Sequence, residues 1–380
     1  MKQSLLSLPI ILFTLLISSP AFAGASAVNP VKATDLDPGS LLLLTAAQEG
    51  DVETVRQMIK EQKNIETKDD YGRTALHIST EHGQAEVAAT LIEAGADIEA
   101  RTQGRALHTY WEYTPLMIAA DWGRPNIAKL LIAAGADVNA RDGSGRVIWT
   151  VLHIAAASGH TEIAELLIEN GADIDALTDP DLNTPLLTAT MGGQTAMAEL
   201  LISKGANINA ANRDASTPLY FAAQSGTFEI VQSLLASGAD VKAKTVAGSY
   251  PGDTPLHASA YSGNTQIAEL LLVKGADINA ANQYGFTPLR RAVDQGHIAM
   301  AGLLIEKGAD LAATDSGGLT VLHVIAQTDR IELAELLISG GAEINAKDIN
   351  LGFTPLDYAE GGEPAMIALL EQHGGICTSC

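Results

Sequence analysis

The feature that most constrains this sequence is a short motif that recurs at a nearly constant interval. Thr-x-Leu occurs nine times between Thr74 and Thr354, and successive copies are 33 to 40 residues apart. Gly-Ala-Asp or a close relative occurs at eight positions from Gly95 to Gly341. Self-similarity of this kind is typical of repeat proteins, in which each unit covers the apolar face of the next. We therefore expect one continuous stack, although 380 residues would otherwise suggest two or three domains.

The residues of the motif indicate that each repeat is a pair of helices. Pro follows the Thr in six of the nine copies, and this pair starts a helix well, because Thr caps free N–H groups and Pro has none to lose. A Gly such as Gly159 is placed to end the first helix, and the Gly of Gly-Ala-Asp to end the second in a left-handed turn. Hydrophobic residues make up 47% of the chain but aromatic residues only 4%, which also favours helices.

Three segments resemble the ankyrin repeat. They are Thr254-Pro255-Leu256-His257, Gly159-His160 and Gly275-Ala276-Asp277-Ile278-Asn279-Ala280. The resemblance covers about residues 40 to 375, some ten repeats. It implies an all-α repeat solenoid, in which antiparallel helix pairs are joined by β-hairpin fingers and form a concave face. It also implies protein binding rather than catalysis.

The two ends of the array depart from the pattern. The first unit lacks both motifs and is expected to be an N-terminal cap at about residues 40–68. The last unit has Glu363 where the inter-helix Gly belongs and is expected to be a C-terminal cap at about residues 347–375. In the ninth unit Thr328-Asp329-Arg330 replaces that Gly, so we expect a weak helix junction there. Three fingers are lengthened, at residues 101–113, 141–149 and 244–253.

The start of the chain has the order of parts found in a secretory signal peptide. Lys2 precedes an apolar run that ends at Ile17, and Ala21-Phe22-Ala23 then offers a cleavage site. We therefore expect residues 1–23 to be a bacterial-type signal peptide, 24–39 a flexible linker and 40–380 the ankyrin repeat solenoid. The protein is predicted to be exported, to the periplasm in preference to the medium, and not to insert into the membrane after cleavage.

No motif for nucleotide, phosphate or metal-dependent chemistry is present, so we predict no enzyme activity, no cofactor and no metal site. The paired acids Asp35-x-Asp37 and Asp179-x-Asp181 lie beside prolines and indicate turns. In the resembled family, the His of Thr-x-Leu-His bonds to the backbone between repeats. We expect this role for His77, His153, His257 and His323.

The sequence ends in a Cys-x-x-Cys motif formed by Cys377 and Cys380. We interpret this segment as a frayed tail, because it has no βαβ context. The alternative is a redox or metal-handling protein that uses these two cysteines.

The leading hypothesis is an interaction scaffold, and its binding residues are sought among the aromatic side chains. In the resembled family, the fingers and the residues just before the inter-helix Gly lie on the concave side. Trp and Tyr are common anchors of interfaces. The alternative is that the long fingers bury their own Trp residues. Nine aromatic residues fall in these positions: Tyr71, Tyr110, Trp111, Tyr113, Trp122, Trp149, Tyr250, Tyr261 and Tyr284.

Charge narrows the class of partner. The net charge of −22 disfavours nucleic acid and indicates a protein with a basic patch. We expect the chain itself to be a monomer. A bacterial effector delivered to a host protein is an alternative that differs only in its destination.

Overall fold

The computed structural model describes residues 36–103, 112–143 and 147–379. The predicted signal peptide and most of the predicted linker lie outside these ranges. All regular elements of the described part are α-helices. Contacts between residues divide the chain into two compact units, Met1–Asn207 and Ile208–Cys380, which we call unit 1 and unit 2.

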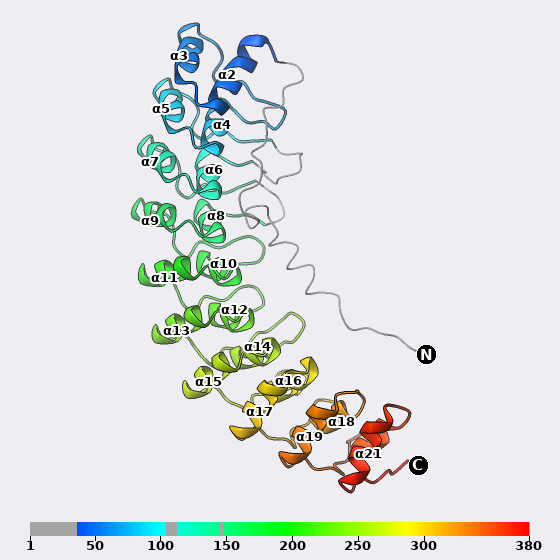
Figure 1. Cartoon of the computed structure of the whole chain (residues 1–380). Helices are drawn as coiled ribbons and strands as arrows, with labels where there is room; N and C mark the ends of the chain where they lie inside the picture. Colours follow the sequence, from blue (N-terminus) through cyan, green and yellow to red (C-terminus); the bar gives the residue numbers. More distant parts are fainter. Residues whose placement is uncertain (1–35, 104–111, 144–146, 380) are drawn as a thin grey trace. The chain divides into compact units, whose positions relative to one another are not determined.

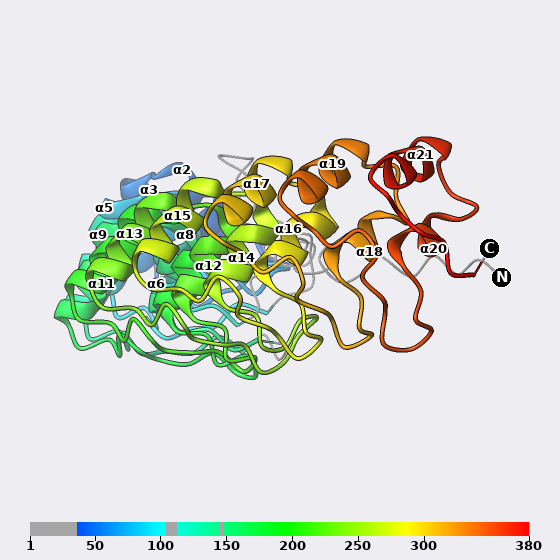
Figure 2. The same cartoon turned by 90° about the horizontal axis from the view of Figure 1, so that it is seen from below.

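Each unit is a stack of helix pairs. In every pair the first helix packs on the first helices of the neighbouring pairs, and the second helix on the second helices. Figure 1 shows these two columns within each unit, and we call their members inner and outer helices. Figure 2 shows that in unit 2 the outer helices, the inner helices and the finger loops form three successive layers.

The inner helices of unit 1 are α2 (Pro38–Glu49), α4 (Ala75–Glu81), α6 (Pro115–Trp122), α8 (Val151–Ser158) and α10 (Pro185–Met191). Its outer helices are α3 (Val52–Lys60), α5 (Ala85–Glu93), α7 (Pro125–Ala133), α9 (Thr161–Glu169) and α11 (Thr195–Ser203).

The inner helices of unit 2 are α12 (Pro218–Ser225), α14 (Pro255–Ser262), α16 (Pro288–Gln295), α18 (Val321–Ile325) and α20 (Pro355–Ala359). Its outer helices are α13 (Phe228–Ala236), α15 (Thr265–Val273), α17 (Ile298–Glu306), α19 (Ile331–Ser339) and α21 (Pro364–Gln372).

The local signals of the motif act as predicted. Thr114 caps α6, because its side chain accepts a hydrogen bond from the backbone N–H of Met117. Gly123 ends that helix with a φ of 64°. A Cβ at this position would lie 2.5 Å from the ring of His160, so both the backbone conformation and the next repeat require glycine. The structure therefore confirms helix starts at Thr-Pro and left-handed turns at the glycines.

Each of the four motif histidines links its own repeat to the following one, as expected. In His153 the Nδ1 atom accepts from the N–H of Thr150, and Nε2 donates to the carbonyl oxygen of Asn183 at 2.9 Å. His77, His257 and His323 make the same pair of contacts to their own Thr and to the following finger. Burial lowers the pKa of His77 and of His153 to about 4, so both rings are neutral at pH 7.

A second set of hydrogen bonds between repeats comes from the residue that precedes each outer helix. His160 donates to the carbonyl oxygen of Asp121, and His297 donates to that of Tyr261. These two histidines begin second helices, as the repeat pattern predicts. Gln84, Arg124 and Gln194 make equivalent bonds in unit 1, and Asn264 and Arg330 in unit 2.

The fingers consist of turns. Among the described residues, the only β contacts are the isolated bridges Arg141 to Thr150 and Ile148 to Asp179. Asp179-x-Asp181 lies in such a turn, as expected. Asp37 is instead the N-cap of α2, because its carboxylate accepts from the N–H groups of Gly39 and Ser40, so the array begins inside the predicted linker.

The interpretation of the C-terminal segment as a frayed tail is wrong for the described residues up to 379. The carboxylate of Asp357 accepts hydrogen bonds from the backbone and side chains of Thr378 and Ser379. Asp357 stands where other repeats have the motif histidine. The tail therefore supplies the contacts that a following finger supplies elsewhere.

The ninth helix junction is irregular but bonded. The inner helix α18 ends at Ile325, and Thr328 donates its hydroxyl to the Ile325 carbonyl oxygen. Arg330 donates to the carbonyl oxygens of Val293 and Asp294 in the preceding repeat. Side chains thus replace the missing glycine turn, although the inner helix is only 5 residues long.

Candidate protein-binding surface

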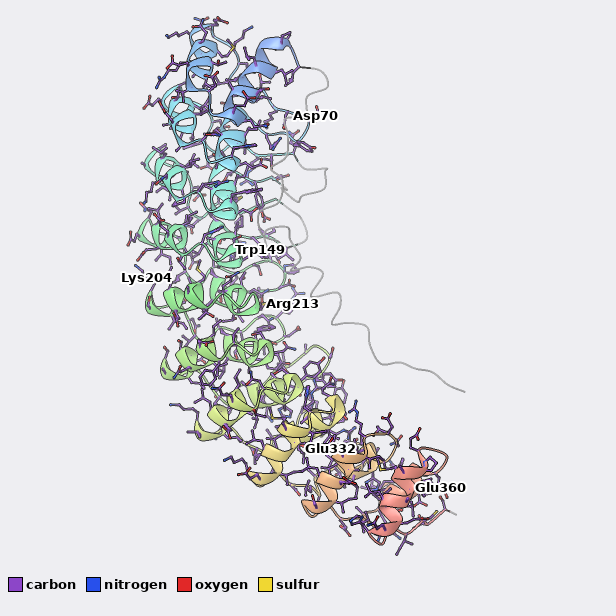
Figure 3. All side chains as sticks on the ribbon, in the orientation of Figure 1. Asp70, Trp149, Lys204, Arg213, Glu332 and Glu360 are labelled. Atoms are coloured by element: carbon purple, nitrogen blue, oxygen red, sulfur yellow. The ribbon has the colours of Figure 1, made fainter. Side chains whose placement is uncertain are left out.

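The aromatic residues predicted to bind a partner divide between the two units. Tyr110 and Trp111 lie outside the described residues. Tyr71, Tyr113, Trp122 and Trp149 belong to unit 1, and Tyr250, Tyr261 and Tyr284 to unit 2. Figure 3 shows Trp149 beside the inner helix α8, whereas Lys204 lies on the side of the outer helices.

The seven described side chains differ in how far they are exposed to solvent. Only Tyr284, with 43% of its surface exposed, is open to solvent among the seven that are described. The ring of Tyr71 lies 5.1 Å from the guanidinium of Arg73, which is buried and pairs with Asp69 and Glu81. The other six described aromatic side chains are each partly exposed, and their role in binding a partner stays a prediction.

Asp121 is the most perturbed carboxyl group near the unit 1 aromatics. It precedes Trp122 at the end of α6, and the hydroxyl of Ser158 donates to it at 3.4 Å. Burial raises the pKa of Asp121 to about 6, the Ser158 hydrogen bond opposes this shift, and the charge of Glu81 adds to it.

In unit 2 two of the predicted tyrosines lie against Arg291, a residue that sequence reasoning did not single out. The guanidinium carbon of Arg291, on α16, lies 3.5 Å from the ring centre of Tyr250 and 4.9 Å from that of Tyr261. Tyr250 comes from the lengthened finger at 244–253, and Tyr261 lies on α14. The Nε atom of Arg291 lies 3.5 Å from Oδ2 of Asp253. We call Tyr220, Tyr250, Tyr261, Asp253 and Arg291 the tyrosine–arginine cluster.

The neighbouring Arg290 has different surroundings. It forms ion pairs with Asp294 at 2.8 Å and Asp315 at 2.9 Å, and it lies over the ring of Phe286. The rings of Tyr250, Tyr284 and Phe286 meet at centre distances of 5.9 to 6.3 Å. The sequence signal for this cluster was the Arg290-Arg291 pair inside an inner helix. Arg290 stands at the motif histidine position, and at the position of Arg291 the other repeats carry mostly apolar residues.

The described residues contain no group of three or more His, Cys, Asp or Glu side chains arranged to hold a metal ion. Cys377 is disulfide-bonded, and Cys380 lies outside the described residues. Within the described ranges, no helix combines the length and the apolar character that crossing a bilayer requires.

Comparison with protein families assigns the chain to a class. Family models of ankyrin repeats match residues 12–102, 152–245 and 244–315, and further ankyrin models match residues 116–168 and 317–349. The chain therefore belongs to the ankyrin repeat proteins, whose members are typically non-enzymatic scaffolds that bind other proteins. The all-α repeat solenoid expected from the motif is confirmed.

A solved structure supports the same assignment. The ankyrin repeat domain of human ASB11 is similar to this chain, with 27% sequence identity and a TM-score of 0.53. The similarity covers 59% of this chain and 98% of that domain. No curated protein matches the chain.

Proposed function

We propose that this protein is an exported scaffold that binds another protein through the inner helices and fingers of its units. Its membership of the ankyrin repeat proteins supports binding over catalysis. The observation that carries the proposal is the cluster of tyrosines in unit 2: Tyr250 and Tyr261 lie against Arg291, and the exposed Tyr284 packs against Tyr250. Tyr and Arg are enriched among the residues that dominate binding energies. In unit 1, Trp122 and Asp121 support a partner that carries a basic patch.

The proposal is tested by capturing partners with the tagged full-length chain in the cells that produce it. Tyr284→Ala removes the exposed ring of unit 2. Val273→Ala is the matched control, because this side chain is 81% exposed but lies at the end of the outer helix α15. A specific partner should be recovered with wild type and with Val273→Ala, and strongly reduced with Tyr284→Ala. Equal recovery of the partner with both variants would mean that the surface around Tyr284 does not bind it.

Export is proposed from residues 1–23 and needs its own test. The intact mass of the exported protein should place Gly24 at its N-terminus. An exported form that retains Met1 would contradict cleavage. Fractionation of periplasm and culture medium separates the proposed periplasmic scaffold from a secreted effector.

A further inference from the structure

The last finger of unit 2, at residues 343–353, has a backbone acceptor that every earlier finger of the unit uses. In the four earlier fingers, the carbonyl oxygen three residues before the motif Thr accepts a hydrogen bond of 2.8 Å from the next finger. These carbonyls belong to Asp214, Pro251, Tyr284 and Gly317. The equivalent carbonyl of the last finger, that of Leu351, accepts no hydrogen bond within the described part of the chain. It is therefore open to an outside donor.

The glycine that follows this carbonyl is also uncovered in the last finger. A Cβ added to Gly252, Gly285 or Gly318 would lie 2.5 to 3.0 Å from atoms of the next finger, because that finger packs directly on the glycine. At Gly352 no atom lies within 4 Å of such a Cβ. Glycine permits the close approach of another backbone. The last finger therefore keeps the same contact surface, and no described residue fills it.

Two large apolar side chains flank this surface. Ile349 is 80% exposed and Leu351 is 63% exposed. Exposed apolar side chains that lie together mark sites of protein interaction. We call residues 349–352, with the open carbonyl, the uncovered glycine and these two side chains, the last fingertip.

The C-terminal tail covers the base of the last finger and leaves the last fingertip accessible. The N–H of Ile376 donates to the side chain of Asn345 at 2.8 Å, as the following finger does in the preceding repeat. The hydroxyl of Thr378 donates to the carbonyl oxygen of Gly352 at 3.4 Å. None of the tail residues up to 379 bonds to Leu351.

Charge selects the kind of occupant. Residues 296–380 contain three basic and twelve acidic residues, whereas the last fingertip is uncharged. Glu343, Glu360 and Glu363 are exposed in the last repeat, and Figure 3 shows Glu360 on the last helix pair. Two copies of a chain with a net charge of −22 repel each other. An apolar segment flanked by Lys or Arg is attracted to this end instead.

An extended segment fits the contacts better than a helix does. Three of the four earlier carbonyls accept from a backbone N–H, and the interior N–H groups of a helix are already bonded within it. In an extended segment alternate side chains point to the same face, so apolar residues two apart cover both Ile349 and Leu351. Addition of an extended segment to an open backbone edge is a general mode of peptide binding.

We propose that the last fingertip binds an extended, apolar segment of the partner protein, flanked by basic residues, in the place of a further finger. A backbone N–H of the segment donates to the Leu351 carbonyl oxygen, and its backbone lies against Gly352. Its apolar side chains cover Ile349 and Leu351, and its Lys or Arg side chains face the exposed glutamates of the last repeat. This inference rests on the proposed scaffold function and names the kind of segment that unit 2 binds.

The first experiment uses a synthetic peptide and needs no knowledge of the partner. Acetyl-Lys-Lys-Val-Ile-Val-Lys-Lys-amide is titrated into the full-length chain, and the backbone amide signals of residues 349–352 are followed by NMR. We expect saturable shifts with a Kd on the order of 1 mM, and binding about 10-fold weaker when the three central residues are N-methylated and lack donors. No shift up to about 5 mM, or equal binding of the N-methylated peptide, overturns the inference.

The place of binding is tested with two glycine variants. Gly352→Asn retains the left-handed backbone, which Asn tolerates, and puts a side chain where the segment lies. Gly361→Asn is the matched control, because Gly361 has a φ of 77°, lies between α20 and α21, and has no atom within 4 Å of an added Cβ. Peptide binding should fall about 10-fold in the first variant and change less than about 2-fold in the second. Equal effects of the two variants, or equal binding of a peptide with Glu in place of Lys, overturn the inference.

A side-chain variant covers the case in which Gly352→Asn does not fold, as judged by circular dichroism. Leu351→Ser removes an exposed apolar side chain and leaves the backbone unchanged. It should weaken peptide binding about 5-fold, and unchanged binding overturns the inference.

The partner captured with wild type separates this inference from the scaffold proposal. Gly352→Asn should weaken partner binding about 10-fold, and Gly361→Asn should not. Loss of the partner with Tyr284→Ala but not with Gly352→Asn overturns the fingertip site and leaves the scaffold function intact. Self-association in sedimentation velocity that Gly352→Asn abolishes identifies a second copy as the occupant and also overturns it. If wild type captures no partner, the scaffold proposal fails, and the peptide titration decides whether the last fingertip binds such a segment.

Discussion

Acid should weaken unit 1 because its two motif histidines are buried in the neutral form. The pKa of His77 and of His153 falls from an ordinary value of 6.5 to about 4 in the fold, and burial is the main cause. The unfolded chain binds protons below pH 6.5, but the folded chain does not until about pH 4. Stability that is fully present above pH 6.5 is therefore lost progressively as the pH falls through this window.

The magnitude follows from the two pKa values of each ring. At pH 5 each histidine costs about 2 kcal/mol relative to pH 7, so together they remove about 4 kcal/mol. Asp121 acts in the opposite direction, because burial raises its pKa to about 6 and the folded state takes up a proton as the pH falls. Its protonation returns about 1 kcal/mol at pH 5. From these three groups together we expect unit 1 to lose about 3 kcal/mol.

The assay is urea unfolding at pH 7 and pH 5, followed by tryptophan fluorescence. All three Trp residues lie in unit 1, so the signal reports that unit. The control is His153→Leu, because Leu187 occupies the same motif position in the next repeat. This variant is less stable at pH 7, since the Asn183 carbonyl loses its donor, but it should lose about 2 kcal/mol less on acidification. Equal losses in wild type and variant would refute the histidine argument.

Four further predictions concern binding and the stability of the ends of the array. If Trp122 anchors a partner, Trp122→Ala should cost about 2 kcal/mol of affinity in titration calorimetry and leave the melting temperature nearly unchanged; a lower melting temperature with unchanged affinity indicates packing instead. Thr378→Ala should speed hydrogen exchange in α20 about fivefold, the effect of losing one capping bond. Hydrogen bonds from Thr354, Thr378 and Ser379 overcome burial and hold the pKa of Asp357 well below its usual 3.8. The stability that the tail contact contributes is therefore complete above about pH 4 and is lost as the pH falls further. The difference in hydrogen exchange between wild type and Asp357→Asn should accordingly vanish in acid. Exchange should also be fastest at residues 320–375 and near residue 45, and uniform protection along the chain would contradict nearest-neighbour stacking.

Much of this fold is readable from the sequence because its signals are local. Thr114 caps a helix whose first N–H groups are three residues away, and Gly123 turns the chain within one residue. The interval between motifs then predicts which helices pack together. The role of His153 needed the ankyrin resemblance, because its acceptor on Asn183 is 30 residues further on.

The C-terminal tail shows where a local interpretation fails. Cys377 to Ser379 carry no periodic signal, and a terminal segment is usually poorly ordered. Its contact depends on Asp357, which lies about twenty residues earlier and stands in the place of a motif histidine. Recognising that a carboxylate there would bond a returning tail required the three-dimensional position of both segments.

The repeat interval, the caps and the glycines account for the helix pairs, because these interactions join residues within one or two turns of the chain. The surroundings of Arg290 and Arg291 do not follow from such rules. Successive residues of a helix point about 100° apart around its axis, so the first arginine meets Asp294 and Asp315, and the second meets Tyr250 and Tyr261. The two adjacent arginines therefore have different environments, because stacking brings different repeats against the two sides of α16.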